Sequence, residues 1–116
     1  MLATVPKSKS LGSILAVLGI VRKSHPTMTV ENLMVLLKVA QNPDIRQRDL
    51  AKDMEMSPSV SSRNIAELSE VKLHGQPGLG FLDSRPDIMD RRHKQLSLTK
   101  DGEKFVSRLE NLLSRS

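Results

Sequence analysis

The chain has no cysteine, tryptophan or tyrosine, and phenylalanine accounts for only two of its 116 residues. Without cysteine it forms no disulfides, no thiol redox centre and no zinc site built on thiolates. The scarcity of aromatic rings argues against a sugar-binding site or a stacking platform for single-stranded bases, because both depend on aromatic faces. We therefore expect a single hydrophobic core made of Leu, Ile, Val and Met, as suits a chain of this length.

The chain also lacks the patterns of titratable residues that are typical of catalytic or metal sites. Its three histidines, His25, His74 and His93, are far apart in the sequence, and no Glu-x-x-His motif joins them. The acidic residues form no pair that suggests acid–base catalysis. The sequence therefore predicts no enzyme activity, no metal ion and no other cofactor.

The most apolar stretch, Leu11–Val21, is about half as long as the roughly 20 residues that a membrane-spanning helix needs. It resembles the core of a signal peptide, but the charged residues Arg22 and Lys23 follow it in place of a small-residue cleavage site. We expect instead a helix over about 10–22 that is buried or dimerises. The protein is then expected to be cytoplasmic and nucleoid-associated, with no membrane partner.

Hydrophobic periodicity and breaker residues predict a mainly α-helical chain with a small β-hairpin, in the order α-α-α-α-β-β-α. The predicted helices are 10–22, a segment opened by Thr29 with Asn32 or by Thr27 with Val30, then 46–54, 58 to 71 or 72, and one opened by Thr99; the predicted strands are 81–82 and 94–98, joined by 84–93. A glycine-rich loop over 75–80 precedes the hairpin. We divide the chain into a tail with an N-terminal helix (1–26), a main domain (27–102) and a C-terminal helix (103–116).

The clearest helix start is Ser57–Pro58, because serine is a good N-cap and proline suits the first helical position. The preceding short helix has Leu50 and Ala51 on its inward side. Two short helices followed by a hairpin predict a winged helix-turn-helix, in which the second helix enters a DNA groove. The net charge of +5 agrees, since a positive surface attracts polyanions.

Both parts of this pattern resemble the MarR family of transcriptional regulators. The matching residues are Asp49–Ala51, Met56–Arg63 and Leu68 in the helices, then Gly80–Leu82, Arg85, Asp90–Arg92, Leu96, Leu98–Thr99 and Gly102 around the hairpin. The resemblance spans about 28–102. It implies a winged-helix fold, binding to double-stranded DNA and a homodimer.

The chain departs from the family pattern at several places. Ser61 and Asn64 stand where the family usually has apolar residues. Arg46 stands where a capping Ser or Thr is usual, which leaves Asp44 as the expected cap of that helix. The link from the recognition helix to the hairpin is longer than usual, and the C-terminal helical region is shorter.

The candidate DNA contacts on the recognition helix are Ser57, Ser59, Val60, Ser62 and Arg63. Small side chains allow a helix to approach base edges closely, and hydroxyl groups bond bases or phosphates. Arg63 is expected to anchor a phosphate or to read a guanine, and the sequence leaves both roles open. The free N–H groups at the helix start also favour phosphate.

The remaining candidates lie on the hairpin and at the start of the first motif helix. Arg91 and Arg92 are expected in the minor groove, where the potential is most negative, with Asp90 orienting one of them. The weaker candidates for phosphate contact on the hairpin are Arg85, His93 and Lys94. Around the first helix of the motif, which crosses the DNA backbone in such folds, the candidates for phosphate contact are Arg46, Gln47, Arg48 and Lys52, with about half of these four expected to be simply solvated.

These features predict a sequence-specific double-stranded DNA-binding transcriptional regulator, a repressor, with its helix in the major groove and its hairpin in the minor groove. Its apolar first and last helices would pair two copies. One alternative is a winged-helix adaptor that binds another regulator or a polymerase component. Another is a sensor that releases DNA on binding a small aromatic acid, which the resemblance allows but no residue pattern indicates.

Overall fold

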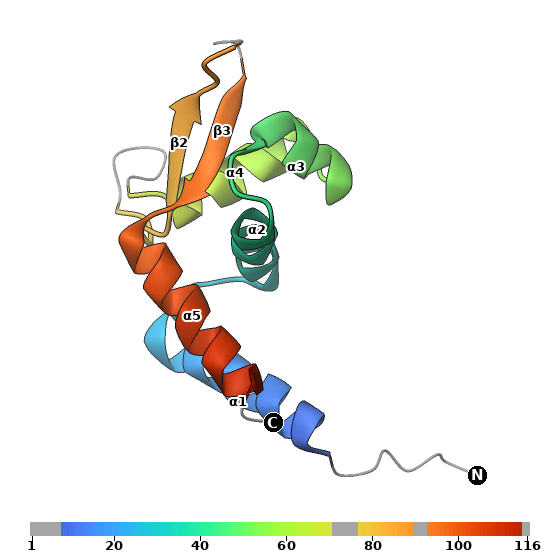
Figure 1. Cartoon of the computed structure of the whole chain (residues 1–116), viewed down its shortest axis with the longest axis vertical. Helices are drawn as coiled ribbons and strands as arrows, with labels where there is room; N and C mark the ends of the chain where they lie inside the picture. The colour runs from blue at the N-terminus through green and yellow to red at the C-terminus, as the bar shows by residue number, and fades with distance from the viewer. Residues whose placement is uncertain (1–7, 71–76, 90–92, 115–116) are drawn as a thin grey trace, which may run out of the picture. The chain divides into compact units, whose positions relative to one another are not determined.

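The computed structural model describes residues 8–70, 77–89 and 93–114 (Figure 1). Several predicted features fall outside these ranges, including nearly all of the tail, the start of the glycine-rich loop and the hairpin residues Asp90–Arg92. The chain forms two compact units. The central unit is Thr29–Val106, and the terminal unit combines the two ends of the chain, up to Met28 and from Ser107.

The described helices and strands follow the predicted order, with one strand added. The helices are α1 (Lys9–Ser24), α2 (Val30–Gln41), α3 (Gln47–Asp53), α4 (Pro58–Leu68) and α5 (Lys100–Ser114); the strands are β1 (Ile45–Arg46), β2 (Leu82–Pro86) and β3 (Lys94–Leu98). The prediction of a mainly α-helical fold with a small β-hairpin is therefore confirmed. The short strand β1 is the element that the sequence did not predict.

Two helices of the central unit begin at predicted capping residues. Of the two starts considered for α2, the pair Thr29 and Asn32 forms a reciprocal capping box, with each backbone N–H donating to the other's side chain. At α4, Val60 N donates to Ser57 Oγ at 3.2 Å, and Pro58 is the first helical residue. Both starts satisfy N–H groups that a helix cannot bond internally.

The start of α5 is also as predicted, whereas the predicted cap of α3 is wrong. Thr99 Oγ1 accepts from Gly102 N at 3.0 Å and so caps α5. The N-cap residue of α3 is Arg46, whose side chain makes no capping hydrogen bond. Asp44 has a φ of 65° and donates its N–H to Leu96 O on β3. Because β1 separates it from α3, Asp44 lies too far back to cap that helix.

A three-stranded antiparallel sheet in the order β1-β3-β2 stands beside the helices of the central unit (Figure 1). The pairing of β2 with β3 begins at Leu82 opposite Leu98 and continues to Pro86. The predicted first strand, 81–82, is therefore too short, and the connection predicted over 84–93 is too long. Polar residues in β2 hid the strand, in which only Leu82 is buried.

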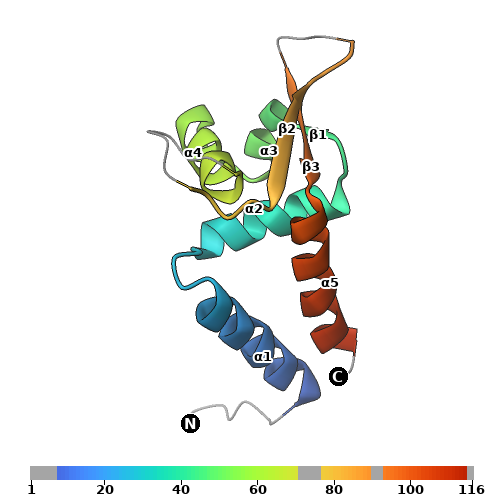
Figure 2. The ribbon, with the colours of Figure 1, turned by 90° about the vertical axis from the view of Figure 1, so that its left-hand side faces the viewer.

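The core of the central unit is aliphatic, as predicted, apart from one aromatic pair. Its buried aliphatic side chains are Leu33, Val35, Leu36, Val39, Leu50, Ala51, Ile65, Leu68, Leu82 and Leu96. Phe81 and Phe105 stack with 4.9 Å between ring centroids. A Cβ at Gly102 would collide with the Phe81 carbonyl, so only glycine fits there. Figure 2 shows α2 crossing the base of the hairpin, and α2 packs against both α4 and β3.

The recognition helix α4 ends at Leu68 rather than at 71 or 72 as predicted. The chain returns after the glycine-rich segment, and its N–H groups bond the carbonyls of the last turn of α4. Leu79 N donates to Glu67 O at 3.0 Å, and Phe81 N donates to Leu68 O at 2.7 Å. These bonds satisfy carbonyls that a helix end leaves open. The helix length thus depends on a later segment of the chain.

In the terminal unit, α1 is covered only in part by its own chain. Val21 is buried, but four other large apolar side chains are exposed: Leu11, Ile14, Leu15 and Leu18. Ser8 caps the helix by accepting from Leu11 N at 3.1 Å. Among the described residues, no helix is both long and apolar enough to cross a membrane.

Candidate nucleic-acid interface

One face of α4 presents three of the five DNA contacts that were predicted for this helix and its cap. Ser57, Ser59, Ser62 and Arg63 are exposed, and Val60 is half-buried. Ser59, Ser62 and Arg63 are three and four residues apart and therefore lie on one side of the helix. The face thus consists of small hydroxyl side chains and one long cation, which suits close approach to another polar surface.

The opposite face of α4 packs on α2 and contains polar residues besides apolar ones. Asn64 is 1% exposed, and its Oδ1 accepts from Asn32 Nδ2 on α2 at 2.6 Å. Asn32 Nδ2 also donates to Glu67 Oε1 at 3.1 Å. Near the exposed rim of the same contact, Arg63 Nη2 lies 4.0 Å from Glu31 Oε1.

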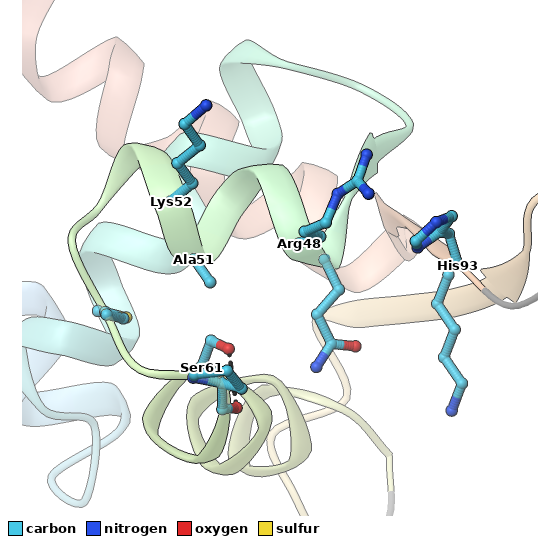
Figure 3. Close-up of a pocket in the computed structure, with 9 residues that line it drawn as sticks. Arg48, Ala51, Lys52, Ser61 and His93 are labelled. Carbon is cyan, nitrogen blue, oxygen red and sulfur yellow. Dashed lines mark hydrogen bonds between the residues drawn. The ribbon is translucent and has the colours of Figure 1, made fainter.

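An open hollow of about 560 Å³ lies between α3, α4 and the start of β3 (Figure 3). Its nine described lining residues are Gln47, Arg48, Ala51, Lys52, Met56, Pro58, Ser61, His93 and Lys94. We call it the basic hollow, because this lining includes three cations and no carboxylate. In Figure 3 the Arg48 guanidinium lies toward His93, whereas the Lys52 ammonium extends away from Ser61.

Gln47 connects α3 with the outward face of α4. Its Nε2 donates to Ser62 Oγ at 2.9 Å, so two predicted DNA contacts are joined in one polar group. The next residue, Arg48, lies 3.9 Å from Asp49 Oδ1, and both side chains are at least half exposed. A pair this exposed is weak, which leaves the Arg48 charge effective toward an anion.

Asp87, which the sequence analysis did not single out, organises the base of the hairpin tip. Its carboxylate is 3% exposed and lies 2.7 Å from the Nε of Arg46, which is 34% exposed. The other oxygen accepts from Met89 N, and the Asp87 N–H donates to His93 O at 2.8 Å. We call this group the hairpin brace. It ties both ends of the tip to β1, directly before α3.

The other hairpin candidates are exposed or lie outside the described residues. Arg85 is 77% exposed, and its Nε donates to Asp83 Oδ2 at 2.9 Å. His93 is half-buried at the rim of the basic hollow. Arg91 and Arg92, with Asp90 between them and the brace, lie outside the described ranges.

The structure thus adds residues that sequence reasoning missed and places Arg46 in a contact that was not foreseen. Arg46 was predicted as a phosphate contact, and its guanidinium pairs with Asp87. The predicted role of Asp90, which is to orient Arg91 or Arg92, lies outside the described residues, and Asp87 pairs with a different arginine, Arg46. Asn32 was noted only as a capping residue, and nothing in its local sequence indicates a partner on α4.

In the described part of the chain, no three His, Asp or Glu side chains are grouped so as to hold a metal ion. The outward face of α4 and the basic hollow present hydroxyls, an amide and cations around a concave surface. Such a surface suits an extended anion more than a small reacting substrate.

Comparison of the sequence with protein-family models and with curated proteins gives no match. The fold, however, is similar to that of solved transcriptional regulators. MarR is 23% identical, with a TM-score of 0.66, and the match covers 90% of this chain and 75% of MarR. MepR from S. aureus, crystallised with DNA, is 17% identical with a TM-score of 0.72, over 90% of this chain and 79% of MepR. FabT from Streptococcus pneumoniae, also in complex with DNA, is 17% identical with a TM-score of 0.67, over 90% of this chain and 68% of FabT. The chain therefore has the winged-helix fold of MarR-type regulators, as its sequence predicts.

Proposed function

We propose that this chain is a sequence-specific double-stranded DNA-binding regulator of transcription that acts in the cytoplasm. The observation that carries the proposal is the basic hollow beside the exposed face of α4. In it, a helix that can enter a groove lies next to cations that belong to α3 and β3. The similar folds of MepR and FabT, both crystallised with DNA, support this assignment.

In this proposal α4 lies in the major groove with Ser59, Ser62 and Arg63 toward the bases. The short hydroxyl side chains let the helix backbone come close, and an arginine is well suited to the two acceptors of a guanine edge. Ser57 and Val60 at the helix start would lie near a phosphate. The positive end of the helix dipole at this first turn favours that phosphate.

The basic hollow would receive the sugar–phosphate backbone between the two grooves. Arg48 and Lys94 supply charge from its two sides, and Gln47 supplies an amide that is already held by Ser62. Contacts of this kind position a protein on DNA without reading its sequence. They also make affinity fall steeply with salt, because each neutralised phosphate releases counterions.

The hairpin would extend this grip into the minor groove. Arg91 and Arg92 are proposed as the groove contacts, with Arg85 and His93 near the flanking phosphates. Arg46 is proposed to act indirectly, because its ion pair with Asp87 supports the start of the hairpin tip. Arginine suits a narrow minor groove, where the negative potential is strongest.

We further propose that two copies pair and that the dimer represses transcription by occupying a promoter. The exposed apolar side chains of α1 favour a protein partner, since a face of this kind is usually covered. A two-fold dimer would bind a pseudo-palindromic site. The same face supports the second candidate function, an adaptor that binds another regulator or a polymerase component.

Selection of bound fragments from a random duplex pool, followed by anisotropy titration at several salt concentrations, tests the function. We expect enrichment of one sequence with two-fold symmetry and an affinity that falls linearly with salt on a logarithmic plot. If no sequence is enriched and the affinity does not change with salt, DNA binding is contradicted and the adaptor is favoured. Light scattering on the same sample measures whether the chain is dimeric.

A further inference from the structure

A buried hydrogen-bond network joins the recognition helix to α2, and we call it the amide clasp. It consists of Asn32 on α2 with Asn64 and Glu67 on α4. Asn32 and Asn64 are 2% and 1% exposed. Both N–H bonds of the Asn32 amide are used, one to Asn64 Oδ1 at 2.6 Å and one to Glu67 Oε1 at 3.1 Å.

The remaining polar atoms of the two amides also have partners. Asn32 Oδ1 accepts from Thr29 N at 3.1 Å within the capping box of α2, and Asn64 Nδ2 donates to Val60 O at 3.0 Å. A buried amide without partners is strongly unfavourable, whereas one with every group bonded is tolerated. Each side-chain nitrogen and oxygen of the two buried amides therefore has at least one hydrogen-bond partner.

Burial alone does not require such a network at this contact. Ile65 and Leu68, on the same inner face of α4, are apolar and buried. Apolar side chains of similar volume often replace buried polar groups without loss of stability. What hydrogen bonds add is directionality, because they weaken steeply when the donor and acceptor are misaligned. Apolar contacts between two helices tolerate small rotations and shifts that a hydrogen-bonded amide pair does not.

The direction imposed by the clasp is transmitted to the outer face of α4. Buried Asn64 follows exposed Arg63 directly in the same helix, so a rotation that moves Asn64 moves Arg63 by the same angle. Successive side chains are about 100° apart around the helix axis. When the helix rotates slightly about this axis, Arg63 and Ser59 move sideways across a groove, and the fold stays intact.

We propose that the amide clasp fixes the rotation of α4 on α2 and thereby determines which bases the outer face reads. Asn32, Asn64 and Glu67 are thus positioning residues for sequence discrimination and do not themselves touch DNA. This proposal rests on the proposed function. Ser61, the other buried polar residue of α4, donates to Pro58 O within its own helix and takes no part in the clasp.

The first test is the substitution Asn64→Leu, which fills the same space without a hydrogen bond across the helices. Asn32 keeps Glu67 as an acceptor but loses the one hydrogen bond that it made to Asn64, so one of its two N–H groups is left without a partner. We expect the urea midpoint to fall, with the variant still folded. The ratio of affinities for the selected site and a scrambled duplex should fall about tenfold, which is the effect of one mismatched base pair. An unchanged ratio in a folded variant would overturn the proposal.

A second pair of variants decides the matter if Asn64→Leu does not fold. Glu67→Gln keeps an oxygen that accepts from Asn32, whereas Glu67→Ala removes it, and both remove the same charge. We expect the glutamine variant to discriminate between the two duplexes as the parent does and the alanine variant to discriminate less. Equal discrimination by the two variants would contradict a positioning role.

A measurement without DNA separates this inference from the proposed function. Because the chain has no cysteine, spin labels can be attached at Met34→Cys on α2 and Ser59→Cys on α4, both of which are exposed. The parent should give one narrow distribution of distances between the labels, and Asn64→Leu should broaden or shift it. An unchanged narrow distribution overturns the clasp inference. A broadened distribution in a protein that binds no DNA would leave the clasp standing and refute the proposed function.

Discussion

The two parts of the candidate interface are attached to the central unit by different chemistry. The recognition helix α4 is held by apolar packing and by hydrogen bonds of the buried Asn32 amide, one to Asn64 and one to the Glu67 carboxylate. The hairpin tip is held by a charged pair, Arg46 with Asp87. The residues that each part exposes differ in the same way, since α4 shows mainly hydroxyls whereas the hairpin and the basic hollow show cations.

This difference predicts that one part of the proposed interface determines sequence preference and that the other determines salt-dependent affinity. Salt screens interactions of buried groups only weakly, so the orientation of α4 should be nearly the same at every ionic strength. The cations of the hollow and hairpin, by contrast, act on phosphates through an attraction that salt screens. Discrimination between sequences should therefore belong mainly to α4, and salt-dependent affinity mainly to the hollow and hairpin.

The largest effect is expected from Arg91→Ala combined with Arg92→Ala. Loss of two groove cations should weaken binding to every duplex about a hundredfold and reduce the logarithmic salt slope by about 2. The double variant Arg22→Ala with Lys23→Ala removes the same charge from α1 and should change the slope little. Gel-shift titrations at several salt concentrations measure both. Unchanged binding would show that the hairpin does not take part.

The next effect tests the hairpin brace through Asp87→Ala. Breaking a buried ion pair destabilises by about 3–5 kcal/mol, but Arg46 is a third exposed and recovers hydration, so we expect about 2 kcal/mol. Urea denaturation measures the loss. The matched variant Asp83→Ala removes an exposed carboxylate from the neighbouring strand and should cost less than about 1 kcal/mol. Equal losses would mean that Asp87 is no special support.

Local chemistry made much of the fold predictable. Thr29, Ser57 and Thr99 each accept a hydrogen bond from a backbone N–H three residues later, so the local sequence is enough to predict these caps. Helical periodicity likewise revealed the inward position of Leu50. The predicted order of the helices was correct for this reason, because every helix except α3 begins at a capping side chain.

The features that escaped prediction depend on residues far apart in the chain. Strand β1 forms because Ile45 pairs with Leu96 on β3. Helix α4 ends at Leu68, where Phe81 N donates a hydrogen bond to the Leu68 carbonyl. The partner of Asn32 lies 32 residues away, and no local pattern indicates it. In the candidate interface, sequence reasoning could therefore propose the exposed residues of α4, but not the contacts that hold the helix in position.

A smaller effect is expected from Arg63→Ala, which tests whether α4 carries discrimination. If Arg63 reads a guanine, the variant should lose about 1.5 kcal/mol of preference for the selected site at one base position and keep its preferences elsewhere. Arg63→Lys retains the charge without the paired donors, so it should recover affinity better than preference. A uniform loss for all duplexes would instead assign Arg63 to a phosphate. That result would weaken the proposed separation between a reading helix and a charged hairpin.

The smallest effect is expected where the two kinds of surface meet, at Gln47. Its amide donates to Ser62 Oγ at an exposed site, so Gln47→Ala should reduce affinity by only about 0.5–1 kcal/mol. Gln41→Ala, on the exposed end of α2, serves as the control and should have no effect. A double-mutant cycle with Ser62→Ala then measures whether the pair acts together on DNA. A coupling of about 0.5 kcal/mol or more is expected if Gln47 holds Ser62 for the same contact. Additive losses would mean that Gln47 on α3 contacts the DNA backbone independently of the base contact of Ser62 on α4. The boundary between the charged region and the reading helix would then lie between α3 and α4.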